Sequence, residues 1–325
     1  MHIPDGFLDA KTAALGAGLA VVGVGIALRS VRRAGSARRV PLIGLAAAFV
    51  FAAQMLNFPV AGGTSGHLIG AVLVAVLLGP SAAVLTLTTV LIVQCFMFAD
   101  GGLTALGANI FNMAIVASGV GYATYALVRR AAGPSLRARL LATAFAAWVS
   151  TVVAAVACAG ELALAGTVAW RIALPAMAGV HMLIGAGEAV ITTLVVAGIA
   201  RVRPELLEAA ADAGGPLRAR EAAAYGLLVA VGLVCFVAPF ASGWPDGLER
   251  VAASLGFAHR TAAPVVSAPL PDYALPGLGR AAVSTIVAGT VGTLLAFGLA
   301  YVLARALTPA RAAGRHPNPG GAPGA

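Results

Sequence analysis

Long apolar runs are the feature that most constrains this chain. Since about 20 apolar residues cross a bilayer as one helix, such runs read as membrane spans. The 325-residue sequence lacks the alternating ten-residue strands of a membrane barrel. We therefore expect an all-α fold, a polytopic transmembrane helix bundle. The nine runs are 12–28, 40–55, 67–78, 81–98, 105–128, 140–159, 173–200, 224–240 and 281–303.

Composition excludes an ordinary water-soluble protein. The chain is 60% hydrophobic and 10% charged, whereas soluble domains are about 25% charged. Its 21 Lys and Arg outnumber 12 Asp and Glu, but these charges sit in short clusters between the apolar runs. The excess is therefore typical of membrane topology and contact with lipid, and we expect no nucleic-acid partner.

The basic clusters give an orientation. They follow the first, fifth, seventh and ninth runs, so alternating spans place most Arg residues on one side. By the positive-inside rule that side is cytoplasmic. We expect a multi-pass membrane protein with its N-terminus outside and its C-terminus in the cytoplasm. The third run is short and is separated from the fourth by Gly79-Pro80, which predicts a tight hairpin.

The runs fall into two groups. Seven spans in residues 1–203 precede a polar, helix-prone segment at 204–223, which we interpret as a cytoplasmic linker. Two spans in 224–304 follow, separated by a long external loop. The tail 305–325 is rich in Gly, Pro, Ala and Arg and is expected to be a disordered cytoplasmic segment.

A histidine directly after Met1 is a candidate metal ligand. The α-amine of Met1, the amide nitrogen of His2 and the Nδ1 atom of His2 can close a five-membered and a six-membered chelate ring. Three corners of a square are then filled. Square-planar nitrogen favours Ni(II) or Cu(II) over tetrahedral Zn(II).

His67 is a candidate for the fourth nitrogen. It follows a glycine-rich segment at the predicted outer end of the third run, on the same side of the membrane as His2. Glycine allows the backbone to come close to a site. The alternative is that His67 is an interfacial polar residue in a helix-capping turn.

His181 and Glu188 lie seven positions apart in the seventh run, hence on one helix face. An ionisable side chain inside a span is a functional candidate, although a structural hydrogen bond between helices is an equal alternative. We expect His181 to support the metal ligands from below. Glu188 lies about 10 Å deeper at about 1.5 Å per residue, where it can bond a neighbouring helix. Gln94, Asn109 and Asn112 are expected mainly to join helices.

Enzymatic chemistry is not indicated. The sequence has no GxxxxGK[ST] phosphate-binding loop, so this chain is not expected to bind ATP, and it has no HExxH motif. No Ser or Cys stands out as an activated nucleophile. The three cysteines show no CxxC spacing.

The N-terminal octet, Met-His-Ile-Pro-Asp-Gly-Phe-Leu, resembles the signature of the CbiM/NikM family. These proteins are substrate-binding membrane components of energy-coupling-factor cobalt and nickel importers. The stretches 66–71 and 181–189 are also similar to that family, and the resemblance covers residues 1–203. The external loop contains Pro245-Asp246-Gly247-Leu248-Glu249, with Asp272-Tyr273 downstream, and resembles the two-span CbiN/NikN partner. The chain thus resembles a fusion of the two components.

The resemblance implies that Met1 and His2 supply three nitrogens and His67 the fourth, with Ni2+ or Co2+ as the transported substrate. It also implies a bacterial or archaeal plasma membrane, a transmembrane CbiQ/NikQ-like partner and CbiO/NikO-like ATPases. The PDGLE part is implied to help load or release metal. A stand-alone, ion-coupled secondary transporter of a divalent metal is the alternative. That class needs a series of membrane carboxylates, and only Glu188 lies well inside a span.

Overall fold

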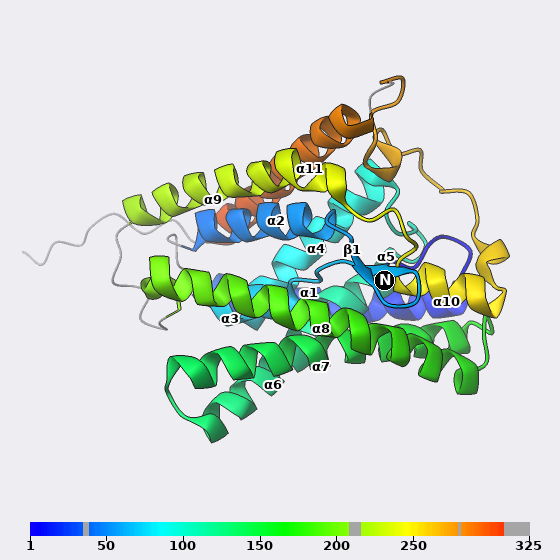
Figure 1. Cartoon of the computed structure of the whole chain (residues 1–325), viewed down its shortest axis with the longest axis horizontal. Coiled ribbons are helices and arrows are strands. Elements are labelled where there is room, and N and C mark those ends of the chain that lie inside the picture. The colour runs from blue at the N-terminus through cyan, green and yellow to red at the C-terminus, as the bar shows by residue number, and fades with distance from the viewer. Residues whose placement is uncertain (35–38, 208–215, 279–280, 309–325) are drawn as a thin grey trace, which may run out of the picture.

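The protein is a bundle of helices lying side by side (Figure 1). The computed structural model describes residues 1–34, 39–207, 216–278 and 281–308. The α-helices are α1 (Ala10–Ala34), α2 (Val40–Gln54), α3 (Ala71–Leu78), α4 (Pro80–Phe98), α5 (Leu106–Asn109), α6 (Ala117–Ala132), α7 (Leu136–Leu164), α8 (Trp170–Val202), α9 (Pro216–Phe236), α10 (Gly247–Leu255) and α11 (Ala281–Leu307). A π-helix, η1 (Ile110–Val116), joins α5 to α6, and strands β1 (Phe58–Val60) and β2 (Thr64–Gly66) form a hairpin.

The all-α transmembrane fold is confirmed. Within the described residues, seven helices are long and apolar enough to cross a membrane: α1, α4, the segment Leu106–Ala132, α7, α8, the part of α9 from Arg220, and α11. Helix α2 is apolar but has only 15 residues, and α3 has eight. These two short helices correspond to the second and third apolar runs.

The third run differs from a simple span. Its helix begins only at Ala71, and the β1–β2 hairpin precedes it. Gly62 and Gly63 form the hairpin turn with φ angles of 79° and 72°, a region that glycine enters without steric cost. Residues 67–70 therefore form a short loop that carries His67 at one end of the bundle. The expected hairpin between the third and fourth runs is present at Gly79-Pro80.

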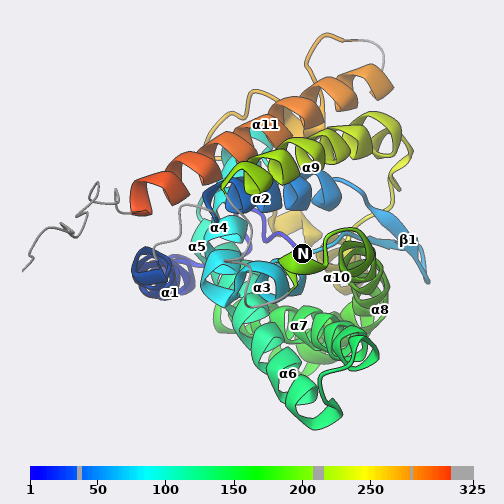
Figure 2. The same ribbon diagram turned by 90° about the vertical axis from the view of Figure 1, so that its left-hand side faces the viewer.

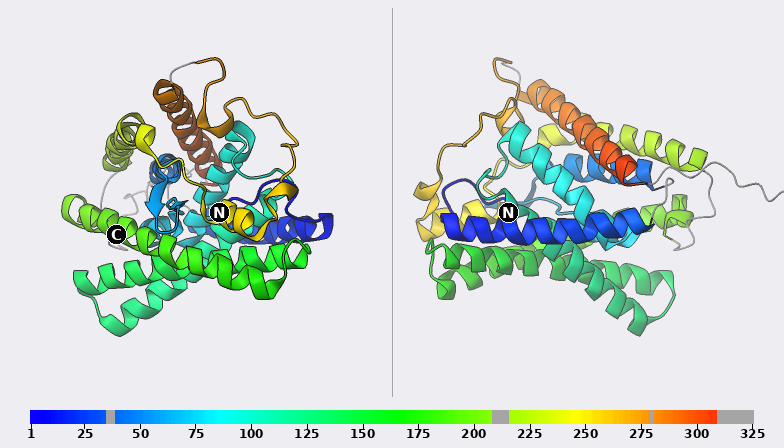
Figure 3. Two further views of the ribbon diagram at one scale, coloured as in Figure 1. Left: turned by 45° about the vertical axis from the view of Figure 1, so that its right-hand side comes forward. Right: turned by 180° about the vertical axis from the view of Figure 1, so that it is seen from behind.

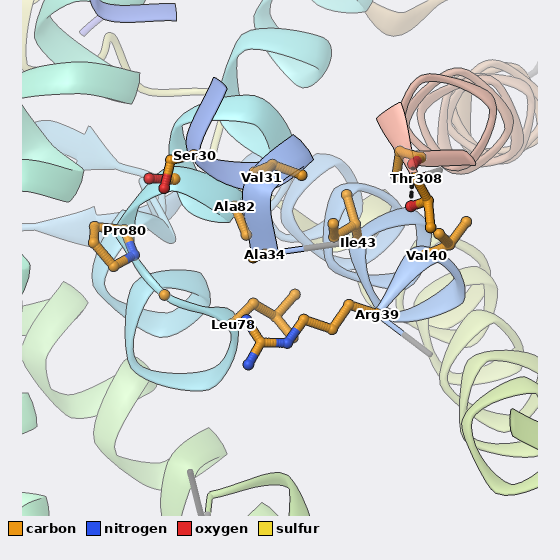
Figure 4. A pocket seen from close by; sticks show the side chains of 13 residues that line it. Ser30, Val31, Ala34, Arg39, Val40, Ile43, Leu78, Pro80, Ala82 and Thr308 are labelled. Atoms are coloured by element: carbon orange, nitrogen blue, oxygen red, sulfur yellow. Dashed lines mark hydrogen bonds between the residues drawn. The ribbon is translucent and has the colours of Figure 1, made fainter. Parts of the chain in front are cut away.

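One end of the bundle carries the basic helix termini. Helices α1, α6, α8 and α11 end far from the chain start (Figures 1 and 3), and their last turns contain Arg residues. This arrangement matches the charge pattern from which the orientation was predicted. At the same end, a cavity of about 240 Å3 lies between α1, α2, the α3–α4 turn and α11, and Arg39 lines it (Figure 4).

The C-terminal helices pack directly on the N-terminal part. Helices α9 and α11 lie against α2, and α11 also contacts α4 (Figure 2). The predicted linker, 204–223, and tail, 305–325, fall partly outside the described residues; α9 begins inside the former and α11 ends inside the latter, at Leu307. Gly292 of α11 has no room for a side chain, because a Cβ there would overlap the ring of Phe51.

This packing yields a prediction for two glycines of the same helix. Gly292→Ala should lower stability by about 1–3 kcal/mol, the usual cost of overpacking. Gly298→Ala is the matched control, since nothing lies within 4 Å of the Cβ position at Gly298. Thermal unfolding of the detergent-solubilised protein measures both variants. Equal unfolding temperatures for the two variants would contradict the close approach of α11 to α2.

Candidate metal-binding site

The chain start is buried at the end of the bundle opposite the basic termini. Met1 is 4% exposed and Ile3 is fully buried. The side chain of Asn109 makes two hydrogen bonds to the backbone of Ile3. The Ile3 amide donates to Oδ1 of Asn109 at 2.8 Å, and Nδ2 of Asn109 donates to the Ile3 carbonyl at 3.0 Å. The Gly102 amide also donates to this carbonyl, at 2.9 Å. These bonds fix the path of the first residues without using His2.

The rest of the octet is held from two sides. Asp5 accepts hydrogen bonds from the amide and the hydroxyl of Thr104, at 2.8 and 2.6 Å. From the other side, the amide of Ala262 in the external loop donates to the Asp5 carbonyl at 2.8 Å. Gly6 has φ of 93°, and a Cβ there would overlap the carbonyl of Arg260. The octet therefore lies between the α4–α5 connection and the loop of the C-terminal part.

The Met1 amine lies close to His67. Its nitrogen is 3.1 Å from Nε2 of His67. Two nitrogen ligands about 2.0 Å from one metal ion and at right angles are about 2.9 Å apart. The amine and the imidazole thus have nearly the separation of adjacent ligands on one ion.

His67 turns its Nε2 atom toward the Met1 amine. Its Nδ1 lies 3.2 Å from the Leu68 carbonyl, which can only accept a hydrogen bond. The ring proton is therefore on Nδ1, and Nε2 keeps its lone pair toward the amine. Burial, followed by the nearby positive amine, lowers the pKa of His67, which favours the neutral ring.

His2 stacks on His67 but turns its nitrogens elsewhere. The ring centroids are 5.3 Å apart. Nδ1 of His2 lies 3.1 Å from Asp100, and Nε2 lies 3.2 Å from Oε1 of Gln94. Binding of a metal ion at Nδ1 therefore has to replace the contact with Asp100. Burial lowers the pKa of His2, against the opposing effect of Asp100.

The PDGLE motif reaches this site. Asp246 accepts a hydrogen bond from the Met1 ammonium group through Oδ2. Its other oxygen caps α10 by accepting from the Glu249 amide at 2.9 Å, while Glu249 accepts from the Asp246 amide at 2.9 Å. Burial alone would raise the pKa of Asp246, but the positive amine holds it well below its usual range. Glu249 thus orients Asp246, and Leu248 between them in sequence is buried.

The same motif is fastened to the His67 segment. Ser65 donates its amide to the Pro245 carbonyl at 2.8 Å and its hydroxyl to the Trp244 carbonyl at 2.7 Å. Gly247 lies on His181, because a Cβ there would come within 2.7 Å of the imidazole. Helix α10 consequently sits beside the chain start (Figure 3).

His181 lies behind the amine. Its Nδ1 is 2.8 Å from the Met177 carbonyl, so Nε2 keeps the lone pair. His181, Met1, His67 and Asp246 all line one cavity of about 10 Å3, about the volume that one water-sized sphere occupies. His181 therefore lies beside the candidate ligands, and its supporting role stays a prediction.

Glu188 holds the loop that carries His67. Its two carboxylate oxygens accept from the amides of Ile69 and Gly70, at 2.6 and 2.9 Å. Gly70 is the N-cap residue of α3, so Glu188 does bond the start of a neighbouring helix. The contact adjoins His67, however, and gives Glu188 a closer link to the site than its depth in the span suggested.

Four residues that belong to the hydrogen-bond network of the site were not identified from the sequence. The sequence does not single out Gln54, Asp100 or Tyr273 as site residues, and it predicts that Gln94 mainly joins helices. Gln54 and Gln94 are hydrogen-bonded to each other, and Tyr273 donates to Asp100 at 2.6 Å. The available signal was a Gln inside each of two apolar runs, 40–55 and 81–98.

The fold and the site together define a polytopic membrane protein with a nitrogen-rich site at its buried N-terminus. The family model described as the cobalt uptake substrate-specific transmembrane region matches residues 2–206, and the PDGLE domain matches residues 220–309. The chain therefore belongs to the CbiM family of cobalt uptake transmembrane proteins and carries a PDGLE domain.

Relatives with the same two-part organisation are similar over most of the chain. A provisionally named fused nickel transport protein NikMN of Archaeoglobus fulgidus is 40% identical and is aligned over 94% of this chain and 98% of its own length. The fused nickel transport protein NikMN of Rhodobacter capsulatus is 35% identical, over 91% and 94%. A crystal structure titled as a truncated transition metal transporter has TM-score 0.57 and 37% identity, covering 62% of this chain and 99% of that chain.

The Glu188 contacts yield a prediction. Glu188→Ala leaves the amides of Ile69 and Gly70 without their acceptor, at a cost of about 1–3 kcal/mol for each buried group. We expect a lower unfolding temperature and a lower yield of folded protein. Glu188→Gln retains one acceptor oxygen and should lose less. Wild-type stability of Glu188→Ala would show that the loop does not depend on this carboxylate.

Proposed function

We propose that this chain is the substrate-specific membrane component of an ATP-driven energy-coupling-factor importer for Ni2+, Co2+ or both. The metal is captured outside the cell by the Met1 amine, the amide and Nδ1 of His2, and Nε2 of His67. The observation that carries the proposal is the 3.1 Å separation of the buried Met1 nitrogen from Nε2 of His67. The names of the relatives, which refer to nickel and cobalt transport, agree with it.

The chemistry of the ligand set supports this choice of metal. Two neutral imidazoles, an amine and an amide nitrogen form a planar set that suits Ni(II) better than Zn(II). Such ligands bind a metal only when they are deprotonated. The lowered pKa of His67 favours the neutral imidazole, which can bind a metal. The planar geometry favours nickel, and the same residues can hold cobalt.

Energy for transport comes from other subunits in this proposal. The chain lacks a phosphate-binding loop, so a transmembrane component and ATPase subunits supply it. The ion-coupled alternative gains no support, because both oxygens of Glu188 are engaged by backbone amides. Orientation follows from the basic helix ends: these face the cytoplasm, and the metal site faces outward.

The free amine provides the first test. One residue added before Met1, or acetylation of the amine, should abolish tight Ni2+ binding, because the amine leaves its chelate ring. Isothermal titration of the purified protein in detergent measures this. A tag added at the C-terminus is the control and should leave affinity unchanged. Full-affinity Ni2+ binding by the N-terminally extended protein would refute the site.

The imidazole ligands give an order of effects. His2→Ala and His67→Ala should cause the largest losses of Ni2+ affinity, and His181→Ala a loss of about 10–100-fold, as is typical of residues that support a ligand. Glu188→Ala should have the smallest effect on affinity. Unchanged affinity of folded His67→Ala would make His181 the next candidate for the fourth ligand.

Transport itself tests the partners. The chain is reconstituted in vesicles with and without its candidate transmembrane and ATPase subunits, and ATP is supplied on the ATPase side. Uptake of radioactive 63Ni2+ should require all the subunits and ATP. Uptake by the chain alone, driven by an ion gradient, would instead favour the secondary transporter.

A further inference from the structure

The three histidines near the site differ in what fixes their ring protons. In His67 and His181 the Nδ1 atom lies against a backbone carbonyl, which can only accept, so the proton must be on Nδ1. His2 contacts a side-chain amide at Nε2 instead. An amide can present either its oxygen or its NH2 group, so its direction has to be determined by something else.

A backbone carbonyl determines that direction through two glutamines. Nε2 of Gln54 lies 2.9 Å from the Ile69 carbonyl, which requires the NH2 group there. Oε1 of Gln54 therefore faces Gln94 and lies 2.8 Å from its Nε2. Gln94 must then turn its oxygen toward His2, 3.2 Å from the ring Nε2. The chain of bonds has only one consistent direction.

The consequence falls on His2. Because the oxygen of Gln94 can only accept, it stabilises the neutral His2 ring that carries its proton on Nε2, and this tautomer leaves the lone pair on Nδ1. Nδ1 is the nitrogen that can close a chelate ring with the amide of His2. In His67, by contrast, the nitrogen left free is Nε2.

A competing acceptor makes this control necessary. Asp100 lies 3.1 Å from Nδ1 of His2 and accepts a hydrogen bond from Tyr273. A carboxylate is a stronger acceptor than an amide, so Asp100 by itself would favour a proton on Nδ1, where the metal has to bind. Gln94 opposes this preference by providing an acceptor at the other nitrogen.

We infer that Gln94 and Gln54 are positioning residues that stabilise the His2 tautomer with its proton on Nε2, which is the tautomer that can bind a metal through Nδ1. This inference rests on the proposed function, in which His2 is a ligand. We call the series of bonds from Ile69 through Gln54 and Gln94 to His2 the relay. Because Ile69 is two residues after His67, the relay also connects the His67 loop to the chain start. Gln94 is fully buried and Gln54 is 4% exposed, so water cannot readily replace either amide.

Two substitutions of nearly equal size separate positioning from packing. Gln94→Met removes the acceptor and should weaken Ni2+ binding by about 10–100-fold. Gln94→Glu keeps an acceptor for His2, and its protonated form can also donate to Gln54. Its affinity should therefore stay within about tenfold of the wild type. Thermal stability should rank in the opposite order, since a buried carboxyl group is more costly than a buried thioether.

The outcomes are distinct. Equal affinities of the wild type and Gln94→Met, or tighter binding by Gln94→Met than by Gln94→Glu, would overturn the inference. In a His2→Ala background, Gln94→Met should have no further effect on affinity, because its effect passes through His2. A full additional loss there would also overturn it.

Failure of the proposed function gives a different result. If His2→Ala binds Ni2+ as tightly as the wild type, His2 is not a ligand, and both proposals fall. If His2→Ala loses binding while Gln94→Met retains it, only the inference about the relay falls. Gln54→Met supplies an independent check and should weaken binding less than Gln94→Met, because Gln94 then keeps its contact with His2 but loses its fixed direction.

Discussion

The structure depends on the burial of a charged chain start. The Met1 ammonium group is held by Asp246 and lies against His67, and a buried charge is tolerated only when it is paired and hydrogen-bonded. The compensating carboxylate comes from the PDGLE segment, 245 positions away in sequence. The ion pair therefore connects the two parts of the chain at the point where we propose that metal binds. The packing of α9 and α11 on α2 is a second contact between the same two parts.

In the proposed site, the same pairing gives the PDGLE segment a part in metal binding. A metal ion that takes the amine must displace its proton and end the ion pair with Asp246, and binding at Nδ1 of His2 must end the contact with Asp100. Tyr273, also from the external loop, donates to Asp100. The C-terminal part thus supplies the partner of the Met1 amine, Asp246, and contacts the partner of His2, Asp100. In the proposed site, loading of the metal would therefore be linked to the contacts of that loop, whose close approach requires glycine at Gly6 and Gly247.

Much of the architecture could be predicted from the sequence because each membrane span is one contiguous run of apolar residues, bounded by Gly, Pro and Arg. The pairing of the chain start with His67 also followed from local information, namely which ends of the spans share a side. The β1–β2 hairpin was missed because its strands have only three residues each and lie between two apolar runs. The π-helix was missed because it lies inside a long apolar run, where hydrophobicity alone does not separate one helical hydrogen-bond pattern from another. Asp246, Asp100 and the two glutamines were missed as partners because their contacts join distant segments, and no periodicity encodes such pairs.

The geometry of the bound metal is the most direct measure of the central claim. X-ray absorption at the nickel edge, recorded on the full-length Ni2+-loaded protein, reports the ligand elements and the symmetry of the site. Four nitrogen ligands in a square plane, with imidazole scattering from two rings, are the predicted result. A tetrahedral or octahedral site, or one dominated by carboxylate oxygens, would contradict a site built from the Met1 amine, His2 and His67.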